Sequence, residues 1–369
     1  MSGLGASTSQ PLLRVEDLSV VFQRKREAAT RAVDGVSFSV APGQTLGLVG
    51  ESGCGKSVTS LAIMGLLPKR GVQVSGRVIY EDRNLLELSD GDLRDLRGAE
   101  IAMIFQDPLS ALNPVIPIGI QVTEVLSRHR GLKGNAADAE AIDLLDRVGI
   151  PDPKRRLTEY PHQLSGGMRQ RALIAMALAC QPRLLIADEP TTALDVTIQA
   201  QILELLRDLV VGSDTALVLI THDLGVVAGL CDTVHVMYAG RIIEHAPRRE
   251  IFYNGRHPYT GGLLGSIPRL DAVRGETLHP IRGSARDAIP WSEAAHSRPD
   301  AITSRTTASG SHRHSRWLPE ATPCAACTRS TGCLKPRPWS QRYDERSEYS
   351  VGGGGAARRV GAEGVFPDP

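Results

Sequence analysis

Gly50-Glu51-Ser52-Gly53-Cys54-Gly55-Lys56-Ser57 is the stretch of this chain that decides its fold. Its spacing, Gly, four residues and then Gly-Lys-Ser, is the phosphate-loop pattern. The apolar run 45–49 before it predicts a strand, and residues 57–67 after it predict a helix. The alternative, a glycine-rich turn with a chance lysine, does not require either neighbour. Strand, loop and helix in this order indicate a phosphate-binding site in an α/β fold.

The residue types of this loop suit a phosphorylated ligand. Glycines let successive backbone N–H groups surround phosphate oxygens without interference from a Cβ, and the start of the following helix adds its positive dipole end. We expect Lys56 to reach the β- and γ-phosphates of a nucleotide and the Ser57 hydroxyl to bind Mg²⁺.

The bulk properties are those of an ordinary globular protein. The 369 residues are 41% hydrophobic and 22% charged, which favours about two domains. A net charge of +1 gives no reason to expect nucleic acid as a partner. We find no apolar run of transmembrane length and no signal pattern at residues 1–10, so we predict a cytoplasmic protein. Cys54, Cys180 and Cys231 are accordingly expected to be reduced thiols.

Strands are expected on both sides of the loop. Residues 12–22 and 33–40 alternate apolar and polar side chains, as in antiparallel strands. Phe22, at the end of the first, could stack on a nucleobase, although position alone favours a core role. The strand 101–105 leads to Gln106, which could complete a Mg²⁺ shell or cap a turn. Helical spacing from residue 118 to about 157 predicts a helical insertion, placed at about 107–165.

Two later strands also end in polar residues. The aliphatic run 183–187 is typical of a strand buried on both faces, and it ends in Asp188-Glu189. Two adjacent carboxylates there are costly unless they face a cation. The strand 217–221 ends in His222, which gains weight only from its matching position. Between these strands and the insertion, Ser165, Gly166 and Gly167 precede a helix, either as a second anion site or as an ordinary N-cap.

The remainder of the chain changes character. Residues 234–238 and 241–244 predict a hairpin with a turn at 239–240, and residues 251–270 predict a short helical stretch. From residue 289 to 369 only eight residues are Ile, Leu, Val, Met or Phe. So few apolar side chains cannot offset chain entropy, and we expect residues 285–369 to be disordered as written.

Taken together, these motifs resemble the nucleotide-binding subunit of an ATP-binding cassette (ABC) transporter over residues 11–284. The most specific is Leu164-Ser165-Gly166-Gly167-Met168-Arg169-Gln170, which resembles the family signature and precedes the run ending at Glu189 as the family requires. Ala193-Leu194-Asp195 resembles the D-loop, and His222 the switch histidine. Residues 105–114 and His257-Pro258-Tyr259-Thr260 resemble the dipeptide and oligopeptide importer ATPases, of which nickel importers are close relatives.

The resemblance implies an ATP-hydrolysing subunit with three regions: a nucleotide-binding domain at 11–250, an importer-type extension at 251–284 and the tail. It implies that Phe22 stacks on adenine, that Ser57 and Gln106 hold Mg²⁺ with Asp188 acting through water, and that Glu189 polarises the attacking water. Lys56 and His222 would contact the γ-phosphate. Two ATPases, favoured to be paralogous sisters, would pair head to tail, with Ser165, Gly166, Gly167 and Asp195 completing the partner's site.

The resemblance also implies further partners. The helical insertion would receive a short helix from a membrane permease at the cytoplasmic face of the plasma membrane, and an external solute-binding protein would supply the cargo. Three alternatives remain open: the same machine carrying nickel or another solute, a soluble ABC ATPase, and a module that holds ATP without cleaving it. A single cassette speaks against the second, and Glu189 with His222 speaks against the third.

The tail departs from the family pattern. Peptide-importer ATPases usually end in a cysteine motif that resembles an iron–sulfur ligand set, whereas this chain has only Cys324, Cys327 and Cys333. Back-translation of residues 294–301 with free third bases permits Cys-Ala-Phe-Ala-Pro-Arg-Cys in another frame, and residues 320–326 permit Gly-His-Pro-Val-Arg-Cys. We therefore hypothesise a frameshift near residues 285–290. An iron–sulfur cluster is expected only if that frame is restored.

Overall fold

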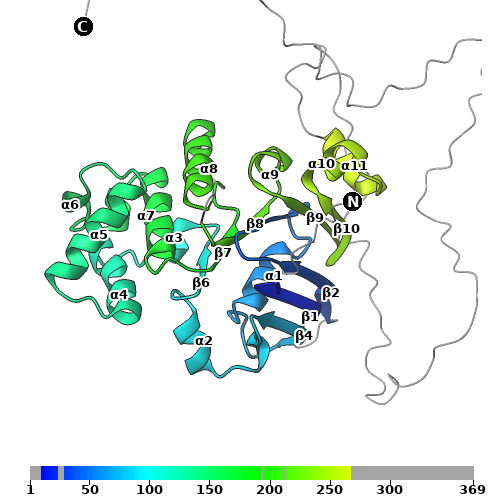
Figure 1. Cartoon of the computed structure of the whole chain (residues 1–369), viewed down its shortest axis with the longest axis horizontal. Coiled ribbons are helices and arrows are strands. Elements are labelled where there is room, and N and C mark those ends of the chain that lie inside the picture. Colours follow the sequence, from blue (N-terminus) through cyan, green and yellow to red (C-terminus); the bar gives the residue numbers. More distant parts are fainter. Residues whose placement is uncertain (1–9, 24–28, 193, 211–212, 267–369) are drawn as a thin grey trace, which may run out of the picture. The chain divides into compact units, whose positions relative to one another are not determined.

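The computed structural model describes residues 10–23, 29–192, 194–210 and 213–266, and the structural statements below concern these residues (Figure 1). The predicted tail at 285–369, its hypothetical frameshift and Cys324, Cys327 and Cys333 lie outside them, as does the part of the extension after residue 266. In the described part of the chain, no helix combines the length and the apolar character needed to cross a membrane.

The phosphate loop leaves the middle of a six-stranded sheet. Its strand order is β10-β9-β3-β8-β7-β6, with every neighbouring pair parallel except β10 with β9. Parallel neighbours end at the same edge, so β3, β6, β7 and β8 deliver their following residues to one place. The strand bounds are β3 Thr45–Val49, β6 Ile101–Ile104, β7 Leu184–Asp188, β8 Ala216–Thr221, β9 Thr233–Tyr238 and β10 Arg241–Pro247.

The central strands are buried on both faces, as their aliphatic runs predict. Every residue of β7 is buried. Because side chains alternate along a strand, Leu184 and Ile186 join one hydrophobic core, whereas Leu185 and Ala187 join the other. Period-two alternation therefore divides one continuous aliphatic run between two cores.

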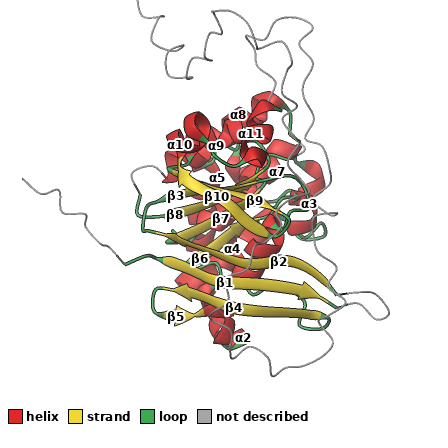
Figure 2. Cartoon of the chain, turned by 90° about the vertical axis from the view of Figure 1, so that its right-hand side faces the viewer, coloured by secondary structure: helices red, strands yellow, loops and turns green. Residues whose placement is uncertain are grey.

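A second, antiparallel sheet covers one of these cores. Its strand order is β2-β1-β4-β5, and Figure 2 shows it beside the central sheet. The helix after the phosphate loop, α1 (Lys56–Ile63), packs against β1 and β2 on one side and β7 on the other. The core between the sheets fixes the direction of α1. The bounds are β1 Leu13–Phe22, β2 Thr30–Val40, β4 Val72–Tyr80 and β5 Arg83–Asn84.

Helices form the other core against the central sheet. Helices α3 to α6 lie between residues 108 and 156, within the range predicted for the helical insertion, and α7 carries the signature at its start. Helices α8 and α9, which the apolar spacing did not single out, flank β8 in the sequence. The bounds are α2 Asp90–Leu96, α3 Pro108–Ala111, α4 Ile118–Arg130, α5 Asn135–Arg147, α6 Pro153–Arg156, α7 Gly166–Leu178, α8 Val196–Val210, α9 Leu224–Leu230, α10 Arg248–Asn254 and α11 Pro258–Gly265, with 3₁₀ turns at Leu85–Glu87 and Pro161–Gln163.

Helix α1 ends earlier than the expected 57–67. Gly65 has φ +62°, the left-handed conformation in which helices commonly end. The Arg97 guanidinium closes this end by donating from Nε to the Met64 carbonyl (2.8 Å) and from Nη2 to the Gly65 carbonyl (2.8 Å). A residue 33 positions away thus sets the end of the helix, which local apolar spacing could not indicate.

His235 of β9 carries a pH-dependent part of the stability. Its side chain is buried and stacks on His245 with ring centroids 5.3 Å apart. Burial, and then the His245 charge, lower the pKa of His235 from 6.5 to about 4. Above pH 6.5 both folded and unfolded states are neutral here. As the pH falls from 6.5 to 4 only the unfolded state gains the proton, so this contribution is lost.

We expect the free energy of unfolding to fall by about 3 kcal/mol more in the parent than in His235→Leu between pH 6.5 and 4. Urea unfolding at several pH values measures this difference in slope, independently of the stability offset that the substitution causes. His162→Leu, at an exposed position, is the control and should keep the parental slope. Equal slopes for parent and His235→Leu would contradict the assignment.

Candidate functional site

The phosphate loop adopts backbone conformations that require glycine. Gly53 and Gly55 have φ +82° and +108°, and Gly55 directly precedes α1. A Cβ on Gly50 would lie 2.2 Å from the Met237 carbonyl oxygen, and one on Gly55 would lie 2.4 Å from the Ala32 carbonyl oxygen. The glycines therefore let the backbone pass close to carbonyls of β9 and β2. Ser52 and Gly53 are exposed.

Lys56 is a buried cation held by carbonyl dipoles. Its side chain is 4% exposed, and Nζ donates to the carbonyls of Gly50 (2.8 Å) and Glu51 (2.9 Å). The Cys54 Sγ lies 3.8 Å from Nζ, and burial raises the pKa of that thiol. Among the described residues Lys56 has no ion-pair partner. A desolvated ammonium without a carboxylate fits a loop that receives anionic phosphate oxygens.

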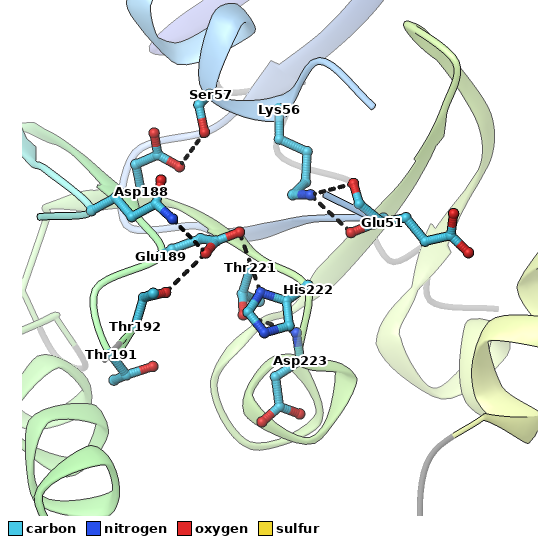
Figure 3. Close-up of polar contacts among 12 residues, drawn as sticks. Glu51, Lys56, Ser57, Asp188, Glu189, Thr191, Thr192, Thr221, His222 and Asp223 are labelled. Carbon is cyan, nitrogen blue, oxygen red and sulfur yellow. Dashed lines mark hydrogen bonds and ion pairs between the residues drawn. The ribbon is translucent and has the colours of Figure 1, made fainter. Parts of the chain in front are cut away.

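Glu189 is fixed from three sides at the end of β7 (Figure 3). Its Oε2 accepts hydrogen bonds from Gln106 Nε2 (3.0 Å) and Thr192 Oγ1 (2.8 Å), and its Oε1 lies 3.2 Å from His222 Nδ1. The residue is 8% exposed and has φ +44°, an uncommon value for a non-glycine residue. A carboxylate has about four acceptor positions, so Oε1 keeps capacity to accept a hydrogen bond from a water molecule.

The neighbouring oxygens fit Mg²⁺. The Ser57 hydroxyl donates to Asp188 Oδ1 (3.0 Å), and Asp188 is only 4% exposed. Burial raises the pKa of Asp188, and a buried carboxylate is unfavourable unless a cation lies beside it. The side-chain amide nitrogen of Gln106 donates to Glu189. The amide oxygen of Gln106 is therefore left as a ligand for a cation. A hydroxyl, a carboxylate and an amide oxygen form the oxygen-rich set that Mg²⁺ prefers.

Residues at or after the ends of β3, β6, β7 and β8 lie together. Figure 3 shows the side chains of Ser57, Asp188, Glu189 and His222 directed toward a common region beside Lys56. Asp188 ends β7 and Glu189 follows it, His222 follows β8, and Lys56 and Ser57 begin α1 after β3. His222 has 60% of its side chain exposed, so it reaches Glu189 from the open side. One candidate nucleotide site therefore comprises Lys56, Ser57, Gln106, Asp188, Glu189 and His222.

The signature residues are not part of this group within one chain. Ser165 caps α7, its hydroxyl accepts from the Met168 N–H (3.3 Å), and it is exposed. In Figure 1 α7 groups with α3 to α6, well away from α1. No hydrogen bond joins residues 165–167 to residues 50–57 in the described part of the chain. Asp195 is likewise exposed and accepts from the Ile198 N–H (3.0 Å) at the start of α8.

Phe22 has a partly buried position at the end of β1, where it packs on the core between the sheets. It pairs with Thr30 of β2 and Val72 of β4. Its side chain is therefore anchored on one side and accessible on another, which is compatible with either the core role or the base-stacking role that the sequence left open.

Two residues of the site escaped sequence analysis. Thr192 donates to Glu189, and the only sequence signal was a hydroxyl three positions after a candidate carboxylate. Tyr259 accepts a hydrogen bond from the Glu51 N–H (3.1 Å), across 208 positions of sequence. His257-Pro258-Tyr259-Thr260 was noted only as a subgroup resemblance, with no reason in the residues themselves to place Tyr259 against the loop.

Comparison with known proteins identifies the family of this chain. The family model described as ABC transporter matches residues 33–192, and that of the oligopeptide/dipeptide transporter C-terminal region matches residues 243–292. The dipeptide transport ATP-binding protein DppD of Bacillus subtilis is 54% identical over 279 residues, which cover 75% of this chain and 83% of DppD. The chain belongs to the ABC transporter family of ATP-binding proteins.

Other ATP-binding cassette proteins are also similar to this chain in sequence and in fold. The oligopeptide transport ATP-binding protein OppD of Escherichia coli is 50% identical over 281 residues, covering 76% of this ABC protein and 82% of OppD. A dimeric post-hydrolysis structure of the ATP-binding cassette MJ0796 with ADP and phosphate is 26% identical, with a TM-score of 0.58, and covers 64% of this chain and 99% of that one. The predicted α/β cassette is confirmed, and the activity is ATP hydrolysis coupled to transport.

Proposed function

We propose that this ABC protein hydrolyses ATP to drive uptake of dipeptides or oligopeptides through a separate membrane permease. The observation that carries hydrolysis is the Glu189 carboxylate, held by Gln106, Thr192 and His222 beside Asp188 and Ser57. The cargo class is supported by relatives named as dipeptide and oligopeptide transport proteins and by the match of residues 243–292. These relatives give no support to nickel import or to a soluble non-transport ATPase.

In the proposed reaction Glu189 accepts a hydrogen bond from the attacking water and takes its proton. The water oxygen bonds to the γ-phosphorus while the bond from that phosphorus to the bridging oxygen of ADP breaks. Lys56 exchanges its carbonyl partners for phosphate oxygens, and His222 turns from Glu189 to the γ-phosphate. Mg²⁺, held by Ser57, Gln106 and Asp188, would neutralise charge on the phosphates when bound.

The exposed signature supports assembly with a second ATPase. Ser165, Gly166 and Asp195 are exposed and Gly167 is half-buried, apart from the phosphate loop of this chain, and the structural relative described above is dimeric. We infer a head-to-tail pair, in which these residues close the partner's site and Phe22 stacks on the adenine. We propose that the second ATPase is a paralogous sister and that the pair lies at the cytoplasmic face of the plasma membrane. The permease would dock on α3 to α6, and an external solute-binding protein would supply the cargo.

Uptake of radiolabelled dipeptides and tripeptides tests the transport claim. Cells of the organism that makes this protein should lose peptide uptake when the gene is deleted. Expression of the unchanged protein should restore it. Lys56→Ala should fail to restore it, because the phosphates then lose their main cation. Restoration of nickel uptake alone would overturn the cargo, and normal peptide uptake without the chain would overturn the transport role.

We also propose the frameshift as a property of the gene. The C-terminal family model stops matching at residue 292, close to the proposed position at 285–290. Among the described residues no group of three His, Cys, Asp or Glu side chains could hold a metal ion. We propose an iron–sulfur cluster only with the restored frame. Sequencing the locus decides the matter: the shifted frame should encode the cysteine motif, and stop codons or other residues there would refute the hypothesis.

A further inference from the structure

The phosphate loop is held from outside by a side chain of the C-terminal extension. The Glu51 N–H donates to the hydroxyl oxygen of Tyr259 at 3.1 Å. Tyr259 belongs to α11, within the segment matched by the oligopeptide/dipeptide C-terminal model, whereas Glu51 is the second residue of the loop. The proposed function assigns no role to this contact. It is a direct link between the extension and the nucleotide site.

Tyr259 has a fixed position of its own. The side chain is 8% exposed, and its ring lies against Tyr238 with centroids 4.5 Å apart and an interplanar angle of 51°. Burial raises the pKa of Tyr259 to about 12, so the hydroxyl stays neutral in the physiological range. The loop amide therefore meets a rigid, uncharged acceptor.

The start of α11 is anchored to the central sheet. His257 caps the helix by accepting the Tyr259 N–H at Nδ1 (3.1 Å). The Glu244 carboxylate of β10 accepts the backbone N–H groups of Arg256 (2.6 Å) and His257 (3.1 Å). This chain of contacts fixes Tyr259 relative to β10, and through β9 relative to the loop. The adjacent turn adds a second restraint, because the Gly240 N–H donates to the Cys54 carbonyl (2.9 Å).

The Glu51 residue is restrained through both of its backbone polar groups. Its N–H is held by Tyr259, and its carbonyl accepts from Lys56 Nζ (2.9 Å). Lys56 has to exchange that carbonyl for phosphate oxygens when nucleotide binds. After the exchange, Tyr259 is the remaining side-chain hydrogen bond to Glu51 among those found in the described residues. Without it the loop would lose more conformational freedom on binding, which lowers affinity.

We propose that Tyr259 is a positioning residue of the phosphate loop, which it keeps in the ATP-binding shape and thereby sets the affinity for ATP. The inference rests on the proposed function, because it assumes that ATP binds to this loop. It assigns a task to the extension: to support the loop through the backbone N–H of Glu51. Tyr259 does not contact Glu189, Gln106, Thr192 or His222, so the chemical step itself should be unaffected.

The test is Tyr259→Phe in the full-length chain, which removes the hydroxyl and keeps the ring. We expect the Kd for MgATP, measured with a fluorescent ATP analogue and by competition with ATP, to rise about three- to ten-fold. The kcat, measured in the assembled transporter, should change less than about two-fold. Hydrogen exchange should speed up in peptides containing the Glu51 amide. Tyr253→Phe, at an exposed position on α10, is the matched control and should keep parental values.

The outcomes separate this inference from the proposed function. Parental ATP affinity and parental exchange in Tyr259→Phe would overturn the inference while ATP binding by the parent stands. A lower Tm with unchanged Kd would show a purely structural role and would also overturn it, as would a loss confined to kcat. Failure of the parent itself to bind ATP would refute the proposed function instead.

Discussion

Replacing Glu189 with glutamine is expected to lower the rate of ATP hydrolysis by at least about 100-fold while ATP still binds. Glutamine has nearly the same shape, so Oε can still accept from Gln106 and Thr192 as Glu189 does now. Its amide cannot take a proton from water. The variant should therefore hold ATP in a site that no longer activates the attacking water.

Two measurements check this expectation in the assembled transporter. Phosphate release under saturating MgATP reports hydrolysis, and retention of labelled ATP reports binding. Glu204→Gln, an exposed glutamate on α8 with 67% of its side chain accessible, controls for loss of a carboxylate and should hydrolyse ATP like the parent. If Glu189→Gln released phosphate at the parental rate, Glu189 would not be the general base, and the residue that activates the attacking water would have to be sought elsewhere.

Much of the fold follows from local sequence. The phosphate loop, the strand before it and the aliphatic runs of β7 and β8 are local features whose periodicity and glycine content define them within about ten residues. The end of α1 was placed too late, because it depends on Arg97, the residue that follows α2. The short strand β5 depends on its pairing with β4. It contains no apolar run from which a strand could be predicted.

The site divides in the same way. Residues at strand ends, such as Asp188 and His222, were predictable because parallel strands bring their carboxyl ends together. The contacts that hold Glu189 and the phosphate loop were not predictable, because they join residues far apart in the sequence. Gln106 contacts Glu189 across 83 positions, and Tyr259 contacts Glu51 across 208. Such contacts are decided by tertiary packing and rotamers. The expectation that Ser165 acts on a second chain came from the family resemblance, and the exposed position of the residue is compatible with it.

Replacing Gly50 with alanine should destabilise the fold and abolish measurable ATP binding. The new Cβ would lie 2.2 Å from the Met237 carbonyl oxygen and 2.8 Å from Cys54 Sγ. The first neighbour is backbone of β9, which is paired with β3 and β10 and cannot move cheaply. Overpacking of this kind costs about 1–3 kcal/mol, and a contact with paired backbone belongs at or above the upper end of that range.

Urea unfolding and MgATP binding on the full-length chain measure the effect of Gly50→Ala. Gly229→Ala in α9 is the matched control, because its Cβ would have no neighbour within 4 Å, and an exchange of Gly for Ala inside a helix is neutral or stabilising by up to about 1 kcal/mol. The clash separates β3 from β9 at the point where the loop begins, so stability and ATP binding should fall together. Parental stability with weakened binding would show that β9 yields and only the loop shifts. Parental values of both would mean that the Met237 carbonyl does not constrain the loop at all.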